Sequence, residues 1–205
     1  MSTAATTDPA PTARGEATRQ AILRAAIERF GREGYRATSV ADIARDAEVG
    51  GTVPYAYFPN KEALFLAAID TDAAGIIAEG LAAVAEASIG AWRETVLLSL
   101  VEGLGEHPLA RRLLAGLEPE VTARVLDIPA LNDLRTAVGD RIRAEQATGS
   151  VRPDIDATAV GNGIVAIVLS LLMSVTQVGG EAAGTYAGDV GRVFEAALSP
   201  PAGPR

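Results

Sequence analysis

The chain has 205 residues, a net charge of −8 and no cysteine. This length is enough for one large domain, or for two unequal domains with a real hydrophobic core. The absence of cysteine excludes disulfides, thiol nucleophiles and thiolate metal sites, and it favours a reducing compartment. Eight basic and six acidic residues lie between Arg14 and Lys61, whereas ten basic and nineteen acidic residues follow, so a slightly basic head precedes an acidic body.

The first residues, 1–16, are rich in Pro, Thr and Ala and lack the basic and apolar regions of a secretory signal. We expect them to form a disordered arm. Helical periodicity begins at Ala17, with apolar residues spaced at i, i+4 as far as Phe30. Gly34 is the expected left-handed stop of this helix.

A second, short helix is predicted from Val40 to Ala47, with Ser39 as its N-cap. The segment that follows, EVGGTVPYAYFPNKEAL, holds two glycines, two prolines and two tyrosines, and Asn60 within it caps the next helix. Two helical elements joined by a tight turn are typical of a helix-turn-helix, whose second element enters the major groove. Pro54 lacks an amide hydrogen and disfavours helical geometry at its predecessor, so this second element is expected to begin late, with Pro54 in its first turn.

Helical patterns continue to the end of the chain, and no segment has the pattern of a strand; the predicted helices are 62–88, 91–105, 108–117, 129–148, 156–178 and 182–198. The helix 156–178 is apolar on all sides and therefore needs partners on two sides. Its most apolar stretch, 163–175, is shorter than the ~20 residues of a spanning helix, so we expect no membrane crossing. We expect the last two helices to pack on a second copy in a two-fold four-helix interface, with candidates Ile164, Ile167, Leu171, Val175, Tyr186, Val190, Val193 and Phe194.

The run from Thr18 to Ile69 resembles the DNA-binding head of the TetR family of transcriptional regulators. The frame F…GY.ATSV.DIA, the pair Y.YF and the run K.ALF occur in the family's order and spacing. The rest of the chain resembles the family in being all-helical and of fitting length, with GSVRPDID as a weaker echo. The resemblance implies an all-α fold with an N-terminal three-helix helix-turn-helix domain at 17–61, a C-terminal helical ligand-binding and dimerisation bundle at 62–199 and a disordered tail at 200–205.

The head supplies the candidate DNA contacts, namely Thr38, Ser39, Gly50, Gly51, Thr52, Tyr55, Tyr57 and Lys61. A tyrosine hydroxyl suits phosphate oxygens, although core packing is the other interpretation of Tyr57. Lys61 is the only lysine and lies at a helix start, where its charge opposes the helix dipole and so indicates an anionic partner.

The head also departs from the family pattern at three positions. Glu48 stands where the turn usually has glycine, Gly50 where a Ser or Thr cap is usual, and Pro54 where Leu or Val is usual. Two of the three residues at the front of the recognition element have no side chain, so we expect modest base specificity from it.

The body supplies the candidate ligand contacts, namely Trp92, Leu104, His107, Leu113, Asn162 and Met173. Core packing is the other interpretation of Trp92, and Asn162 is compatible with a ligand contact, a bond across the dimer or a local bond. A single histidine without cysteine makes no metal cluster, so no metal site is expected. GNGIVA at 161–166 matches a dinucleotide pattern but follows no strand, which favours close helix packing.

We therefore expect a cytoplasmic, ligand-responsive, dimeric repressor that binds a palindromic operator in double-stranded DNA and is released by a small molecule. The sequence has no acid/base or nucleophile constellation, so neither an enzyme nor a cofactor is expected. The alternative is a helical small-molecule carrier or interaction protein whose DNA-binding head is weakened or lost.

Overall fold

The computed structural model describes residues 13–88, 90–121 and 127–200, with the backbone alone described for residues 180–187. Across these residues the chain forms α-helices and short 3-10 segments, and it forms no strand, which confirms the all-α expectation. The elements are α1 (Ala13–Ala37), α2 (Val40–Asp46), η1 (Val53–Ala56), α3 (Lys61–Glu86), α4 (Trp92–Gly103), α5 (Pro108–Leu114), α6 (Pro129–Ala147), α7 (Ala157–Val178) and α8 (Gly180–Leu198).

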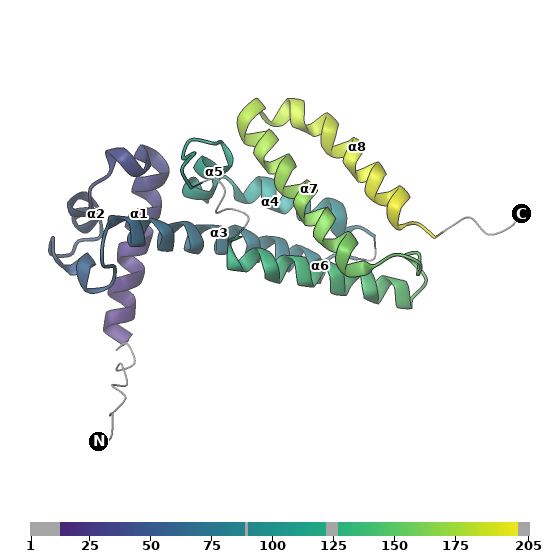
Figure 1. Ribbon diagram of the computed structural model, residues 1–205, viewed down its shortest axis with the longest axis horizontal. Helices are drawn as coiled ribbons and strands as arrows, with labels where there is room; N and C mark the ends of the chain where they lie inside the picture. Colours follow the sequence, from purple (N-terminus) through teal and green to yellow (C-terminus); the bar gives the residue numbers. More distant parts are fainter. Residues whose placement is uncertain (1–12, 89, 122–126, 201–205) are drawn as a thin grey trace, which may run out of the picture.

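The helices form a small head and a larger body joined by one long helix (Figure 1). The head contains α1, α2 and η1, and α3 runs from it along the body, where α4 and α6 pack against it. On the other side of α6, α7 packs along it, and α8 lies alongside α7. Because α3 is a single helix of 26 residues, any movement of its body end is transmitted to the head.

The start of α3 belongs to the core of the head. Asn60 caps it, since its side-chain oxygen accepts a hydrogen bond from Ala63 N at 2.8 Å. One turn later, the Phe65 ring packs edge-on against Phe30 with centroids 4.8 Å apart, and Tyr35 lies 4.7 Å from the same ring. The domain boundary expected after Lys61 therefore falls inside a helix that head and body share.

The first helix differs from its prediction at both ends. It begins at Ala13, so residues 13–16 are helical and not part of a disordered arm; residues 1–12 lie outside the described residues. Gly34 has φ 84°, as its predicted role as a left-handed stop requires, and the last turn from Tyr35 to Ala37 follows this break.

The apolar helix α7 has the bounds that the sequence predicted, to within one residue. Asp156 caps it with hydrogen bonds from Thr158 N and Ala159 N, and it continues for 22 residues. By length and composition it is able to span a membrane, which corrects the expectation that its apolar stretch is too short. The core helix of a soluble bundle passes the same test, and α7 packs against α4, α5, α6 and α8.

The first glycine of GNGIVA, Gly161, serves helix packing, whereas a Cβ on Gly163 would meet nothing within 4 Å. A Cβ on Gly161 would lie 3.0 Å from Gly139 N and 3.1 Å from Gly139 Cα, so α6 and α7 touch backbone to backbone at this point. The phosphate-binding interpretation fails because the segment lies inside α7.

This contact predicts opposite effects for two alanine substitutions. Gly161→Ala should destabilise the protein by about 1 kcal/mol, because overpacking against backbone at ~1–3 kcal/mol exceeds the ~1 kcal/mol gain in helix propensity. Gly139→Ala should be neutral or stabilising, since its Cβ would meet Ala157 O at 3.6 Å, an ordinary contact. Thermal unfolding measures both; equal melting temperatures for the two variants would contradict the backbone contact.

Candidate nucleic-acid interface and ligand cavity

The second helix is positioned by its own first turn. The Ser39 hydroxyl accepts from Asp42 N at 3.1 Å and donates to Asp42 Oδ2 at 2.6 Å, which satisfies the N-terminus of α2. Thr38 is 2% exposed and donates its hydroxyl to Gly34 O at 2.9 Å. The expectation of a DNA contact by the Thr38 side chain is therefore wrong, because that hydroxyl is used inside the head, whereas Ser39 remains exposed.

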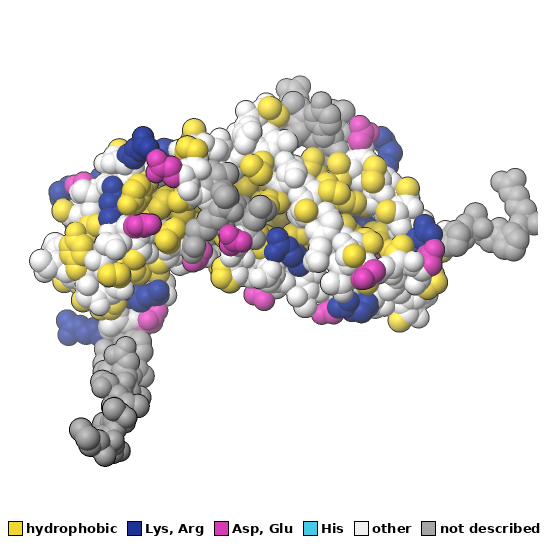
Figure 2. Space-filling model, viewed as in Figure 1, with side chains coloured by type: hydrophobic (Ala, Val, Ile, Leu, Met, Phe, Trp, Pro, Cys, Tyr) yellow, Lys and Arg dark blue, Asp and Glu magenta, His cyan; other side chains and the backbone are white. Residues whose placement is uncertain are grey.

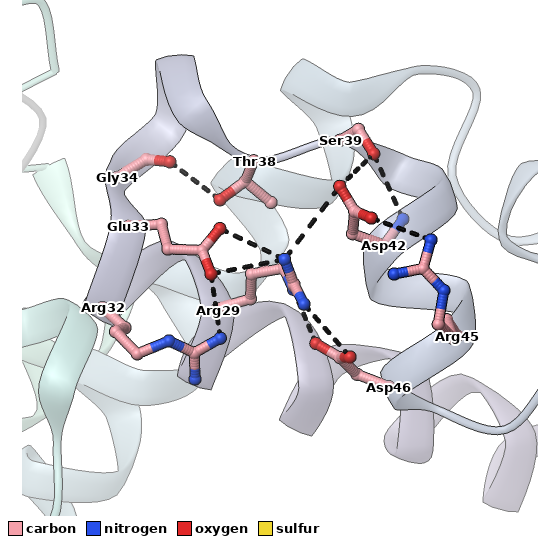
Figure 3. Close-up of polar contacts among 9 residues, drawn as sticks. All are labelled: Arg29, Arg32, Glu33, Gly34, Thr38, Ser39, Asp42, Arg45 and Asp46. Atoms are coloured by element: carbon pink, nitrogen blue, oxygen red, sulfur yellow. Dashed lines mark hydrogen bonds and ion pairs between the residues drawn. The ribbon is translucent and has the colours of Figure 1, made fainter.

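One arginine holds α2 against α1 (Figure 3). Arg29 Nε donates to Asp46 Oδ2 at 2.6 Å, and its Nη1 donates to Glu33 Oε2 at 3.1 Å. Arg29 Nη1 is also 4.0 Å from Asp42 Oδ2. The Arg29–Glu33 spacing of four residues is readable on a helix, but the link to Asp46 joins residues 17 positions apart. Sequence reasoning missed this link for that reason.

These contacts change the pKa of two carboxyl groups in the head. The hydrogen bond from Arg29 lowers the pKa of Asp46 below its ordinary value. The hydrogen bond from the Ser39 hydroxyl lowers the pKa of Asp42 in the same way. Because both pKa values are lowered in the folded head, the contacts stabilise it above the ordinary aspartate pKa and lose this contribution as the pH falls.

The turn between α2 and η1 contains a strained residue. Glu48 has φ 56°, the only positive φ among the described residues other than glycine. The turn is closed by hydrogen bonds from Glu48 N to Arg45 O and from Val49 N to Ala44 O. A side chain in this left-handed conformation costs about 1–2 kcal/mol relative to right-handed geometry, which explains why glycine would suit the position.

The recognition element is a single 3-10 turn and not the α-helix that the sequence predicted. Pro54 is buried in its first turn, as expected, and Pro54 O accepts from Tyr57 N and Phe58 N. Gly50, Gly51 and Thr52 precede the turn and are exposed. Pro54 has no amide hydrogen to donate to an earlier carbonyl, so the helical turn begins no earlier than Val53. It ends at Ala56.

The remaining candidate DNA contacts divide into exposed and packed side chains. Tyr55 is 54% exposed, so its hydroxyl is free to meet a phosphate. Tyr57 is half-buried and packs against the head core, in line with the alternative interpretation. Lys61 is half-buried at the start of α3, with Nζ 4.3 Å from the centroid of the Tyr35 ring.

The body contains a cavity with wholly apolar walls and a volume of about 60 Å³. Helices α3, α4, α5, α6 and α7 all contribute to it, with Ile76, Leu100, Leu113, Leu134 and Val168 as representatives. Small-molecule pockets are larger than this, so a ligand has to widen the cavity when it binds.

Of the candidate ligand contacts, Leu113 alone lines this cavity. Leu104 is buried outside it, Met173 is partly buried against the core, and Asn162 is exposed in a shallow polar pocket beside Arg143 and Thr158.

The candidates for the dimer interface divide into buried and exposed side chains. Ile164, Leu171 and Phe194 are buried within the protomer. Ile167 and Val193 are exposed, Val175 and Val190 are half-buried, and the Tyr186 side chain lies outside the described residues.

His107 and a buried aspartate join α3 to α5. Asp72 is 4% exposed, and its Oδ2 accepts from Leu109 N at 2.9 Å and from Ala110 N at 2.8 Å. Its Oδ1 lies 2.8 Å from His107 Nδ1. On the far side of α5, Gly31 of α1 lies against Pro108, so close that a Cβ on Gly31 would be 2.7 Å from Pro108 Cβ. Thus α5 lies between the head and the cavity.

The tryptophan is buried in a polar cluster away from the apolar cavity. Trp92 Nε1 donates to Glu145 Oε1 at 3.0 Å, and Glu145 is 2% exposed. Arg93 and Arg141 each pair with this carboxylate at 3.1 Å. Trp92 also lines a second, smaller cavity of about 10 Å³. Trp92 therefore belongs to the buried core and also lines a cavity.

The strained turn makes a sharp prediction. Glu48→Gly should raise the free energy of unfolding by roughly 0.5–1 kcal/mol, because relief of the left-handed strain exceeds the added freedom of the unfolded chain. Glu48→Ala is the control, since it removes the charge but keeps a Cβ at positive φ. A melting temperature raised equally by both substitutions would show that charge, and not backbone strain, matters at this position.

Known proteins resemble this chain in the sequence of its head and in its overall fold. Residues 22–68 match the family model of the bacterial regulatory proteins of the tetR family. The chain is 39% identical over 49 residues to the HTH-type transcriptional regulator YuxN of Bacillus subtilis. That match covers 24% of this chain and 17% of the relative, so it concerns the head alone.

Solved structures match over nearly the whole chain. A TetR-family protein from Mesorhizobium loti has a TM-score of 0.72 at 17% identity and covers 92% of this chain and 100% of its own. FadR of Thermus thermophilus, a TetR-family transcriptional repressor in complex with lauroyl-CoA, has a TM-score of 0.62 at 21% identity, covering 91% and 98%. These likenesses show the fold. Together with the match of residues 22–68, they show that the chain has the fold of TetR-family regulators and a head that matches the DNA-binding domain of this family.

Proposed function

We propose that the protein is a cytoplasmic, dimeric repressor that binds a palindromic operator and is released by a small apolar molecule, without enzymatic activity. The observation that carries this proposal is the position of α5. Ala110, Leu113 and Leu114 on this helix line the cavity, while Pro108 at its start contacts Gly31 of the head. One short helix thus touches both the ligand space and the DNA-binding unit.

Release follows from a shift between two arrangements of the same helices. A ligand that fills the cavity favours the position of α5 that accommodates it. Because Asp72 binds the first amides of α5, α3 moves with it and carries the head. In a dimer, the distance between the two heads then no longer matches two half-sites one helical turn apart.

The chemistry of the cavity indicates the effector. Its walls are wholly apolar, and an apolar cavity inside a protein stays dry and binds apolar molecules. The lauroyl-CoA complex of the Thermus thermophilus relative supports an effector with an apolar chain, since that structure shares the fold.

Dimerisation is supported by the composition of α7. Its mean hydropathy over 18 residues is 2.0, but only 33% of this window is buried within the protomer. Ile167 on α7 is 39% exposed and Val193 on α8 is 60% exposed. Figure 2 shows hydrophobic side chains gathered over the body on the face where α7 and α8 lie. A second copy of this face would cover them.

A carrier or interaction protein with a weakened head is the second candidate, and the recognition element favours it. The element is one 3-10 turn preceded by two glycines, so Thr52 and Tyr55 are its only exposed polar side chains, beside the exposed methyl group of Ala56. Selection of DNA from a random pool by the full chain distinguishes the two. A repressor enriches a palindrome with two half-sites, whereas a carrier enriches no sequence.

Two substitutions in the head should weaken binding to all DNA sequences alike. Tyr55→Phe removes a phosphate donor, and Lys61→Ala removes a charge and so should reduce the salt slope of the affinity by about 1. Arg152→Ala, at the far end of the body, is the control and should leave binding unchanged. Fluorescence anisotropy across salt concentrations measures this. A changed sequence preference at full affinity would show that these residues read bases.

A charge on the exposed apolar face should separate the protomers. Ile167→Glu would place an unpaired carboxylate in the proposed interface at a cost of ~3 kcal/mol or more, and light scattering should then show monomers. Tyr55→Glu is the matched control, because it adds the same charge to an exposed hydrophobic side chain of the head and should leave the dimer intact. A folded dimer of the Ile167→Glu protein would exclude this face.

A further inference from the structure

The second cavity of the body has a polar wall that the apolar cavity lacks. It is lined by Trp92 and Arg93 of α4 together with apolar side chains of α6 and α7. Leu134, Val165 and Val168 line both cavities, so the two spaces adjoin at these side chains. A ligand in the apolar cavity therefore has the second cavity as a neighbour.

One nitrogen of the Arg93 guanidinium is buried without a hydrogen-bond partner in the described part of the chain. Arg93 Nη1 donates to Gly90 O at 3.4 Å, and its Nη2 donates to Glu145 Oε2 at 3.1 Å. Its Nε is buried and has no hydrogen-bond partner within the described part of the chain. An orphaned buried N–H is rare in proteins and indicates an additional acceptor, such as a water or a ligand.

The charges around Arg93 are already balanced. Arg93 and Arg141 share the buried carboxylate of Glu145, and Glu195 of α8 also acts on the Arg93 guanidinium. Burial lowers the pKa of Arg93, and these carboxylates oppose that effect. With two cations facing two anions, an acceptor at Nε completes a hydrogen bond without having to supply charge.

We propose that the effector is an elongated apolar molecule that ends in an uncharged carbonyl oxygen, and that this oxygen accepts a hydrogen bond from Arg93 Nε. The apolar part fills the apolar cavity, and the carbonyl end passes between Leu134 and Val168 into the second cavity. This inference rests on the proposed function, because it assumes that the body binds an effector. It makes Arg93 the residue that selects ligands by their polar end.

Three eight-carbon probes test the inference on the full chain: 2-octanone, octanoate and octane. Their binding is followed by the emission of Trp92, the only tryptophan, which lies at the second cavity. Arg93→Met should weaken 2-octanone about tenfold, as expected for a bond from a charged donor, and leave octane unchanged. Each ratio compares two proteins with one probe, so the solubility of the probe cancels.

Arg141→Met is the matched control. It removes the other arginine from Glu145 but lines neither cavity, so binding of all three probes should be unchanged. Equal weakening of 2-octanone and octane by Arg93→Met would reduce Arg93 to a packing residue and overturn the inference. Tightest binding of octanoate, with the largest loss in Arg93→Met, would overturn the uncharged end.

The wild-type protein provides a second measurement that needs no variant. The infrared carbonyl stretch of bound 2-octanone should lie below its value in an alkane solvent, because the carbonyl accepts a hydrogen bond. An unshifted stretch would mean that Arg93 Nε–H donates to a water molecule and not to the ketone. Failure of all three probes to bind a protein that still selects palindromic DNA overturns this inference alone, whereas ketone binding without DNA selection overturns the repressor alone.

Discussion

The buried carboxylate of Asp72 is the interaction on which the arrangement of this molecule depends. It receives the first free amides of α5 and the ring of His107, so it fixes a seven-residue helix that is too short to be stable alone. Once fixed, α5 closes one side of the apolar cavity and supports α1 of the head. Without this anchor, α3 alone would connect the cavity to the DNA-binding unit.

The head combines a modest basic excess with extensive internal pairing. Arg29 is occupied by Glu33 and Asp46, and Arg45 pairs with Asp42. These arginines mainly hold α2 in place and contribute little free charge to a DNA surface. The groups that remain for DNA include exposed hydroxyls, Lys61 and the exposed arginines Arg14 and Arg24 of α1, so the head offers both short-range hydrogen bonds and positive charge.

Local signals predicted much of this fold, and distant pairings account for what they missed. The caps at Ser39 and Asn60 and the stop at Gly34 depend on neighbouring residues, so the sequence indicated each of them correctly. The burial of Thr38 and the 3-10 turn at Pro54 depend on how the head packs. Glu145 collects donors from residues more than 50 positions away, and no periodicity reveals such a cluster. For this reason the sequence did not indicate that Arg93 and Glu145 form the polar end of the candidate ligand site.

At the exposed glycines before η1, DNA recognition can be changed without a change in the stability of the head. A Cβ added to Gly51 would meet nothing within 4 Å, and one added to Gly50 would meet only Val53 at 3.6 Å. Neither glycine has a positive φ, so the backbone does not require them. Side chains can therefore be introduced at the front of the reading element without disturbing the head. This makes the protein a tolerant starting point for evolving recognition of new operators, because each gained base contact leaves the rest of the fold as it was.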